Sequence, residues 1–431
     1  MRQHLGMLQD ILSSLFERRS EASAASDGRP LDVLCEELLT SKGEVSGYRL
    51  AKIILDRIDA LDDQAVAEFF LLLANRFDID DAAVVKAGGQ YRQERSADNM
   101  ARLMAAAESK RQELLRRLNQ FPDATARLVR LREKLLIMAK SEETLKRVDL
   151  DFRHLFYSWF NRGFLVLRRI DWQTPANILE KIIQYEAVHE IDDWEDLRRR
   201  LQPEDRRCYG FFHPLMPNDP LIFVEVALGD GVPNSIQAIL STDREIMRQS
   251  SANTAVFYSI STCQKGLQGI SFGNFLIKQV VQHLKQELPN LKRFITLSPM
   301  PKFLTWLARQ TEADASLAES VTLARAGEVS DAEALKRQAA SYLFAAKTAE
   351  RTPLDPVARF HLNNGALIED IHANADVSKK GLRQSAGVMV NYLYDLKKIE
   401  QNHEIYAAKQ KIAISGRIKS LLTAANHKGK K

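Results

Sequence analysis

The segment "STCQKGLQGISFGNFLIKQVVQHL" holds three glycines, Gly266, Gly269 and Gly273, just before a stretch with helical periodicity. A strand is predicted over 254–261 and a helix over 273–288. Free N–H groups and the dipole at a helix start bind anions such as phosphate, and glycine lets a ligand approach the backbone closely. The spacing fits neither the dinucleotide fingerprint nor the P-loop, which needs a following Gly-Lys-Ser/Thr. The residues alone leave two interpretations open, an anion-binding loop and a tight strand-to-helix turn.

Two further residues have side chains that can do chemistry. Ser298 closes the predicted strand "KRFITLS", and polar residues at the carboxyl ends of strands are where α/β folds place functional groups. His361 lies in "DPVARFHLNNG", just ahead of an Asn-Asn-Gly turn, and an imidazole suits proton transfer near neutral pH. A serine before proline is also a common turn start, and a single histidine is often a partly buried structural residue. Nothing in the spacing joins Ser298 to His361.

The elements that must position these residues fall into two regions. Residues 1–160 have the three- and four-residue apolar spacing of helices, which continues without a break over 97–121. We therefore predict an all-helical bundle that serves as an oligomerisation domain. Residues 161–431 contain short β-branched and aromatic runs such as "LIFVEVAL" and "TAVFYSIS", mixed with helical stretches. The chain is thus predicted to be α+β, with a helical bundle followed by an α/β domain, in which 351–378 is loop and strand and 391–422 is helix.

Composition narrows the class of protein. A net charge of +5 suits an anionic small ligand and does not call for nucleic acid. The three cysteines, Cys35, Cys208 and Cys263, lie far apart, which argues against a disulfide framework or a zinc site. Apolar runs are too short to cross a bilayer, and residues 1–20 carry acidic side chains that targeting segments avoid. We expect a cytoplasmic protein that binds no membrane and no nucleic acid.

Several long motifs in one order resemble the malonyl-CoA decarboxylase family. They are "FYSISTCQKGLQGISFGNFLIKQVV", "ITLSPMPKFLTWL" and "DPVARFHLNNGALIEDIHANADVSKKGLRQSAGVMVNYLYDL", and the resemblance runs from about residue 150 to 425. It implies a GNAT-like catalytic domain that binds acyl-CoA, with malonyl-CoA as the substrate. It also implies a homotetramer built as a dimer of dimers, and a place in fatty acid metabolism.

The resemblance assigns site residues one by one. It implies that Ser298 and His361 are catalytic, together with Lys181 in "LEKIIQYEAVH" and Tyr394 in "NYLYDL". Some relatives carry a glutamate where this chain has Ser271, so no carboxylate role transfers to that position. The residues implied to contact the substrate, besides Ser298 and His361, are Gln268, Gly269, Ile270, Ser271, Phe272, Gly273, Asn274 and Ile277.

The implied reaction sets two chemical tasks. Loss of CO2 from malonyl-CoA leaves an enolate of acetyl-CoA, whose oxygen must be stabilised and whose carbon must receive a proton. His361 suits the proton transfer, and Ser298 suits binding of the leaving carboxylate or relay of the proton. The thioester is itself the electron sink, so no metal or organic cofactor is expected. Two alternatives remain, a GNAT-type acyl-CoA N-acyltransferase, which needs an amine acceptor, and a non-catalytic acyl-CoA sensor.

Overall fold

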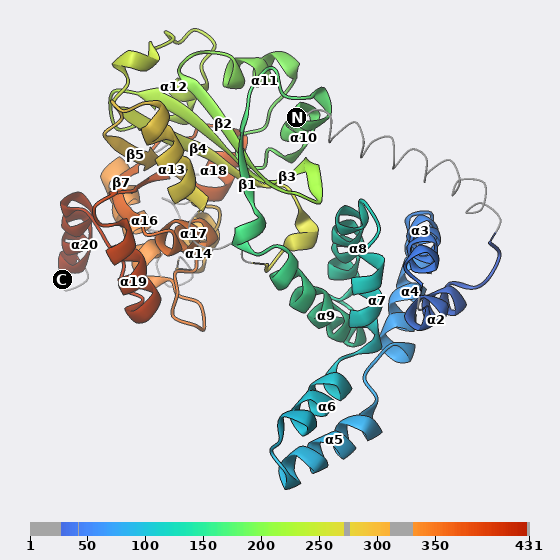
Figure 1. The fold of residues 1–431 in the computed structure, drawn as a ribbon. Coiled ribbons are helices and arrows are strands. Elements are labelled where there is room, and N and C mark those ends of the chain that lie inside the picture. Colours follow the sequence, from blue (N-terminus) through green and yellow to red (C-terminus); the bar gives the residue numbers. More distant parts are fainter. Residues whose placement is uncertain (1–26, 42, 271–275, 311–330, 429–431) are drawn as a thin grey trace. The chain divides into compact units, whose positions relative to one another are not determined.

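The computed structural model describes residues 27–41, 43–270, 276–310 and 331–428, which divide into two compact units (Figure 1). The first unit contains the described residues of Met1–Phe164, His213–Pro217 and Gln264–Ser271. The second contains those of Leu165–Phe212, Asn218–Cys263 and Phe272–Lys431. Two segments from the later part of the chain, 213–217 and 264–270, therefore belong with the helical unit.

The first unit is helical, as predicted. Its helices follow the apolar periodicity of the sequence, and side-chain caps on Asp62, Asp80 and Ser96 begin three of them. Two short 3-10 turns, η1 (Arg162–Phe164) and η3 (Lys265–Leu267), complete it. The helices are α2 (Leu31–Thr40), α3 (Glu44–Asp59), α4 (Asp63–Arg76), α5 (Asp81–Gln93), α6 (Ala97–Ala107), α7 (Lys110–Leu118), α8 (Ala124–Met138) and α9 (Glu143–Trp159).

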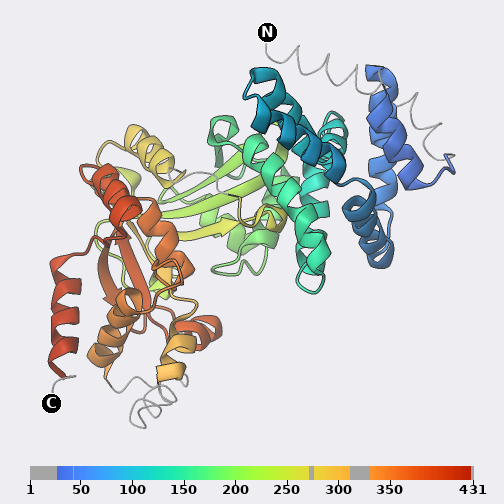
Figure 2. The same cartoon turned by 90° about the horizontal axis from the view of Figure 1, so that it is seen from below.

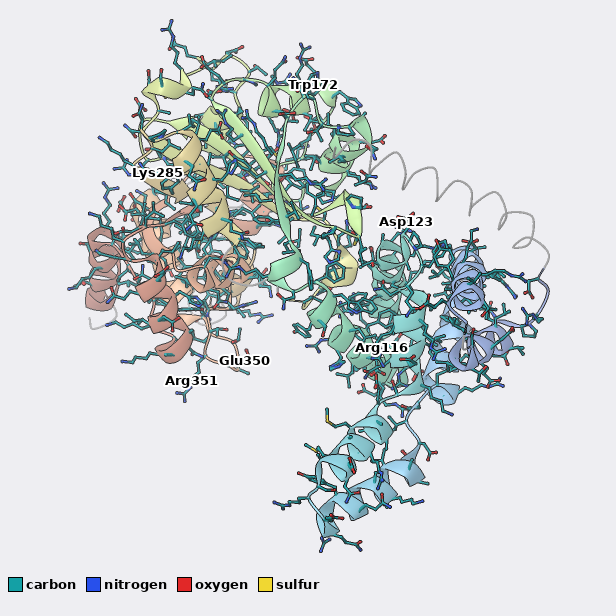
Figure 3. The ribbon with its side chains drawn as sticks, viewed as in Figure 1. Arg116, Asp123, Trp172, Lys285, Glu350 and Arg351 are labelled. Atoms are coloured by element: carbon teal, nitrogen blue, oxygen red, sulfur yellow. The ribbon has the colours of Figure 1, made fainter. Side chains whose placement is uncertain are left out.

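The stretch 97–121 was predicted as one helical run and is instead two helices. The Ser109 hydroxyl accepts a hydrogen bond from the N–H of Gln112 at 3.3 Å and caps the start of α7. The same hydroxyl donates to the buried carboxylate of Asp151 in α9 at 2.9 Å. A second break follows α7, where Asp123 (labelled in Figure 3) takes a left-handed φ of 62° before α8 begins. Local capping thus ends one helix and begins the next, although the apolar periodicity of the sequence is helical along the whole stretch.

The second unit is built on a mixed sheet. Its strands lie in the order β1-β2-β3-β4-β5-β8-β6, with β7 also paired to β8. β4 and β5 are parallel, whereas β3 with β4 and β5, β6 and β7 with β8 are antiparallel. The strands are β1 (Val166–Ile170), β2 (Arg206–His213), β3 (Met216–Gly229), β4 (Thr254–Thr262), β5 (Arg293–Thr296), β6 (Ser298–Pro299), β7 (Leu367–His372) and β8 (Met389–Leu393).

Helices cover this sheet through two apolar clusters. Ile182 of α10 and Leu197 of α11 pack on Phe223 of β3 in one cluster. Ile236 of α12 packs with Val256 and Ile295 in the other. Near the chain end, α16 and α20 pack on each other and on β7 (Figure 2). The helices are α10 (Ala176–Tyr185), α11 (Trp194–Leu201), α12 (Ile236–Leu240), α13 (Leu276–Glu287), α14 (Phe303–Gln310), α16 (Ala332–Ala345), α17 (Pro356–Asn363), α18 (Lys379–Ser385), α19 (Ile399–Lys409) and α20 (Gly416–Lys428), with the turn η2 (Gln249–Ser251).

The predicted class, a helical region followed by a mixed-sheet domain, is confirmed. Two local predictions were wrong in part. The stretch 351–378 was predicted as loop and strand, and it contains strand β7, but its Asp-Pro pair begins helix α17. The stretch 391–422 was predicted as helix, but it opens with strand β8, and helix resumes only at Ile399.

Candidate active site

Ser298 lies where the chain leaves the parallel strand β5. The strand ends at Thr296, and Ser298 then pairs with Val390 of β8 in the short bridge β6. Only 5% of Ser298 is exposed. The serine is therefore held just beyond a strand end by its pairing with β8.

Helix α17 brings His361 to the serine. Asp355 caps this helix by accepting from the N–H groups of Val357 and Ala358 at 2.9 and 3.0 Å, and Pro356 occupies the first turn, where proline is well suited. His361 lies in the last turn and is 2% exposed. Gly365 follows with a φ of 80°, and a Cβ there would lie 2.1 Å from the carbonyl oxygen of Ile399, so only glycine fits this helix exit.

A continuous hydrogen-bonded chain joins four side chains. Ser298 Oγ lies 3.0 Å from His361 Nε2, and His361 Nδ1 lies 2.7 Å from Tyr394 Oη. At the other end, Ser298 Oγ donates to Thr296 Oγ1 at 2.8 Å. The structure thus brings three of the predicted catalytic residues together and adds Thr296, which sequence reasoning missed.

The direction of each bond follows from counting hydrogens. Ser298 has one hydroxyl hydrogen, which it donates to Thr296, so it must accept from His361 Nε2. A neutral imidazole carries one N–H, so Nδ1 is the acceptor for the Tyr394 hydroxyl. The hydrogens of these three bonds therefore all point from Tyr394 toward Thr296.

Burial explains why the imidazole is neutral. It lowers the pKa of His361 from 6.5 to about 3, because the charged form loses its hydration. Burial also raises the pKa of Tyr394, which keeps its proton. This differs from the expectation that His361 titrates near neutral pH, since the protein without ligand holds it uncharged.

Neighbouring groups lock this chain in place. The ring of Tyr392 stacks on the His361 imidazole, with ring centres 4.5 Å apart and planes 22° apart. The N–H of Tyr392 donates to Thr296 Oγ1 at 3.1 Å, and Asn391 Nδ2 donates to the carbonyl oxygen of Thr296 at 2.8 Å. Strand β8 therefore holds both the histidine plane and the threonine hydroxyl.

Lys181 lies on α10 and contacts the beginning of β3. Its Nζ donates to Asp219 Oδ1 at 2.6 Å and to the carbonyl oxygen of Asn218 at 3.1 Å. Its contacts within the described residues do not include Ser298, His361 or Tyr394. Two residues beyond Asp219, the carbonyl oxygen of Leu221 accepts from the N–H of Cys263, where β4 leads into the glycine loop. Lys181 thus stands at the sheet end from which that loop leaves.

The described part of the glycine loop is Gln264–Ile270, and it packs within the helical unit. A Cβ on Gly266 would lie 1.8 Å from the carbonyl oxygen of Val129 in α8, so the close approach that this glycine permits is to a helix backbone. Gly269 has a φ of 80°, a conformation that favours glycine. Four of the predicted substrate contacts, Ser271, Phe272, Gly273 and Asn274, lie outside the described residues. Ile277 is completely buried in α13.

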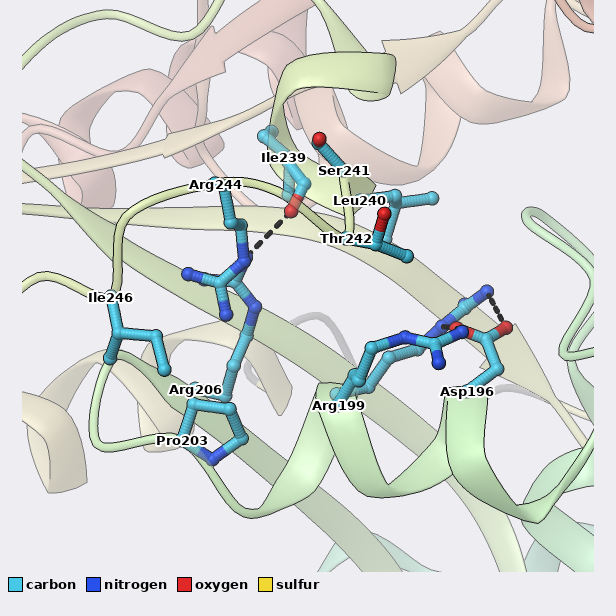
Figure 4. Close-up of a pocket in the computed structure, with 11 residues that line it drawn as sticks. Asp196, Arg199, Pro203, Arg206, Ile239, Leu240, Ser241, Thr242, Arg244 and Ile246 are labelled. Carbon is cyan, nitrogen blue, oxygen red and sulfur yellow. Dashed lines mark hydrogen bonds and ion pairs between the residues drawn. The ribbon is translucent and has the colours of Figure 1, made fainter.

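A separate pocket of about 90 Å³ lies between α11 and the segment 239–246 (Figure 4). Its arginines already have partners: Arg200 pairs with Asp196 at 2.9 Å, and Arg206 donates to the carbonyl oxygen of Ile239 at 2.6 Å. Arg244 pairs with a buried aspartate, Asp205. We read this pocket as a structural ion-pair network and not as part of the Ser298 site.

Two of the residues that sequence reasoning missed had a local signal. Thr296 stands two positions before Ser298 in the same run, so both side chains share a strand face. Asp355 followed by Pro356 is a helix-start pair. The helical residues that contact the glycine loop had no such signal, because they lie in a different region of the chain.

The fold and site together define a class. A mixed sheet and one capped helix bring a serine, a neutral histidine and a tyrosine into one directed hydrogen-bonded chain. This is an α/β enzyme with a serine–histidine site suited to proton transfer.

Comparisons with known proteins give the family. The family model described as Malonyl-CoA decarboxylase C-terminal domain matches residues 163–431, and Malonyl-CoA decarboxylase N-terminal domain matches 77–160. The mitochondrial malonyl-CoA decarboxylase of Rattus norvegicus is 33% identical over 402 residues, which cover 83% of this chain and 81% of that protein. The solved malonyl-CoA decarboxylase of Rhodopseudomonas palustris is 50% identical, with a TM-score of 0.85, over 90% of this chain and 98% of that one. That of Agrobacterium vitis is 47% identical, with a TM-score of 0.83, over 91% and 99%.

The chain therefore belongs to the malonyl-CoA decarboxylase family, whose members are carboxy-lyases. The predicted family and enzyme class are confirmed. Among the helices of the described residues, none has the length and apolar character needed to cross a membrane.

Proposed function

We propose that this protein converts malonyl-CoA to acetyl-CoA and CO2 through a thioester enolate that His361 protonates by way of Ser298. The observation that carries the proposal is the directed chain from Tyr394 through His361 and Ser298 to Thr296. Family membership supplies the substrate, and this chain supplies a proton path of the right kind. No metal or organic cofactor takes part in the proposed steps.

The low pKa of His361 suits a reaction that begins with an anion. The malonyl carboxylate brings a negative charge to the site, and a nearby negative charge raises a histidine pKa. His361 then takes up a proton on Nδ1, and the Tyr394 hydroxyl turns from donor to acceptor. The imidazolium therefore forms only when substrate is present.

Loss of CO2 then comes first, and protonation of the enolate follows. The bond between the carboxyl carbon and C2 breaks, CO2 leaves, and the electron pair enters the thioester as an enolate. C2 takes the hydroxyl proton of Ser298, and His361 Nε2 returns a proton to that oxygen. His361 ends neutral with its hydrogen on Nδ1, and transfer of that hydrogen to Tyr394 with rotation of the tyrosine hydroxyl back to a donor would restore the starting Nε2–H tautomer; one proton in total has become part of acetyl-CoA.

The remaining site assignments rest on the family resemblance and are proposed with it. Gln268, Gly269 and Ile270 would contact the acyl-CoA substrate, as would Ser271, Phe272, Gly273, Asn274 and Ile277. For Lys181, the salt bridge with Asp219 supports a role in holding the sheet end next to the loop. We further propose that the catalytic domain, 161–431, is GNAT-like.

We also propose that the protein is a cytoplasmic homotetramer, a dimer of dimers that acts in fatty acid metabolism. The helical domain, 1–160, would be its oligomerisation domain. Exposed apolar side chains on the paired helices α5 and α6 support this, since Val85 and Met104 are 76% and 66% exposed.

The test is conversion of malonyl-CoA, followed by mass spectrometry of acetyl-CoA, for the wild type and for Ser298→Ala and His361→Ala. We expect both variants to lose about 10²–10⁴-fold in kcat, the usual contribution of acid–base groups. His154→Ala is the control, because that histidine is exposed on α9.

Two other outcomes would count against the proposal. Unchanged turnover in both variants would move the proton transfer to other residues. A wild type that binds acetyl-CoA without consuming malonyl-CoA, but acylates an added amine, would favour the N-acyltransferase.

A further inference from the structure

The glycine loop after β4 is held by two helices of the first unit. The turn η3 and the residues after it lie against α8 and α9. The loop carbonyl oxygens of Gly266, Gln268 and Gly269 all accept hydrogen bonds from side chains of those helices. Since isolated surface loops lack such partners, these contacts need an explanation.

Arg132 of α8 is the principal contact. It is 1% exposed, and its Nη1 donates to the carbonyl oxygens of Gly266 and Gln268 at 2.6 and 3.0 Å. Its Nε donates to Asp149 Oδ1 of α9 at 2.8 Å, and its guanidinium lies 5.8 Å from the centre of the Phe156 ring. The carboxylate of Asp149 holds the planar guanidinium of Arg132 through Nε. This contact fixes the orientation of Nη1 toward the two loop carbonyl oxygens.

Tyr157 of α9 adds a second contact from the surface. Its hydroxyl donates to the carbonyl oxygen of Gly269 at 2.9 Å, although the residue is 46% exposed. Removing this hydroxyl leaves the core untouched. That makes Tyr157 a clean probe of the loop.

The loop backbone is ordered on its other side by its own turns. The N–H groups of Leu267, Gln268 and Ile270 donate to carbonyl oxygens three residues earlier, each at 3.0 Å. Gly266 cannot move toward α8, because the Val129 carbonyl oxygen already occupies the space of a Cβ. The backbone of Gln264–Ile270 is therefore restrained in three ways. Its own turn hydrogen bonds, the contact of Gly266 with α8 and the side-chain donors of α8 and α9 all hold it.

We propose that Arg132 and Tyr157 are positioning residues for acyl-CoA binding, so that the helical domain shapes the substrate loop as well as joining subunits. This rests on the proposed function, in which the same loop contacts the substrate. A loop already held in its binding conformation does not have to be ordered when the ligand arrives, which strengthens binding. The helical domain acts on affinity for the CoA thioester and not on the proton transfer.

The experiment compares Tyr157→Phe and Arg132→Lys with the wild type in the full-length protein. Steady-state kinetics with malonyl-CoA give KM and kcat, and calorimetric titration with acetyl-CoA gives Kd. Arg130→Lys is the matched control, because it makes the same change on an exposed position of the same helix. Thermal unfolding is measured for each variant.

For Tyr157→Phe we expect KM and Kd to rise about two- to tenfold, the effect of losing one neutral hydrogen bond, with kcat within twofold of wild type. For Arg132→Lys, which loses the Nε–H donor to Asp149 that orients the side chain toward the loop, we expect about tenfold or more. Arg130→Lys should match the wild type.

Unchanged Kd and KM in Tyr157→Phe, with Arg132→Lys altering only the unfolding temperature, would overturn the proposal and leave these contacts structural. A fall in kcat at unchanged KM would overturn it too. If the wild type binds acetyl-CoA but does not turn over malonyl-CoA, the proposed function fails, and the Kd values still decide the role of Arg132 and Tyr157.

Discussion

Thr296 is the residue on which the direction of the hydrogen-bonded chain through Ser298 and His361 depends. It is completely buried and accepts from both Ser298 Oγ and the N–H of Tyr392. Because it takes the Ser298 hydrogen, it forces His361 to donate through Nε2. A buried threonine can in this way set which histidine nitrogen carries the proton.

Replacement of Thr296 by valine keeps the shape of the side chain and removes its oxygen. We expect kcat to fall about 10- to 100-fold with little change in KM, because Ser298 loses its partner and its orientation. Thr296→Ser restores the oxygen and should return kcat to within a few-fold of wild type. Steady-state kinetics with malonyl-CoA measure this, and a valine variant as active as the serine variant would contradict it.

Buried neutral histidine also makes stability depend on pH. The folded pKa of His361 is about 3 against 6.5 for the free side chain, so below pH 6.5 the unfolded chain binds a proton that the folded one refuses. The contribution of His361 to the free energy of unfolding is therefore fully present above pH 6.5 and is lost as the pH falls toward 3. We expect up to about 1.4 kcal/mol of unfolding free energy lost per pH unit from this group.

Urea unfolding of the wild type and His361→Gln between pH 7.5 and 4.5 checks this expectation. The wild type should lose stability more steeply than the variant on acidification. His189, whose pKa burial lowers to about 4, adds a slope of the same sign in both proteins. Equal slopes for the two proteins would show that His361 titrates normally when folded.

At the scale of elements, helix α17 carries the histidine, and its position depends on its first turn. Asp355 accepts from Val357 and Ala358 N–H and from the Tyr342 hydroxyl at 3.1 Å. Asp355 is 1% exposed. The cap therefore ties the catalytic helix to α16 as well as beginning it.

We expect Asp355→Ala to cost about 1–2 kcal/mol of unfolding free energy from the lost cap, with more from the unpaired Tyr342 hydroxyl. It should lower kcat by moving His361. Asp355→Asn keeps an acceptor and should be milder in both. Denaturant unfolding and turnover of the two variants measure this, and an alanine variant with wild-type kcat would show that α17 is positioned by packing alone.

At the scale of the whole molecule, the apolar surface of α5 and α6 points to self-association. The two helices pack on each other, yet Val85, Met100 and Met104 remain exposed. Apolar side chains gathered on one helical pair favour a protein interface. This is the part of the helical unit through which we expect the tetramer to form.

Light scattering of Val85→Lys combined with Met104→Glu tests this expectation. We expect a smaller assembly than the wild type, because two charges would be buried in the interface. Lys86→Glu, on an exposed α5 position, is the control and should keep the wild-type mass. A double variant that remains tetrameric would place the interface elsewhere.

Local pattern predicted much of this protein correctly. Apolar periodicity identified the helical half, and β-branched runs identified β3, β4 and β5. Motifs in order identified the family, and the structure brings Ser298 and His361 within hydrogen-bond distance. The helix around His361 was not predicted, although Asp355 followed by Pro356 is typical of a helix start, because α17 has only eight residues before the Asn-Asn-Gly turn ends it.

By itself, then, the sequence determined most of the helical and strand segments, because backbone preference and side-chain periodicity are local properties. Tertiary structure alone decided that His361 is buried and neutral, since desolvation depends on everything packed around it. It also decided that Gly266 meets the backbone of α8 and that Arg132 holds the loop. Those partners are more than a hundred residues apart in the chain, and only folding brings them into contact.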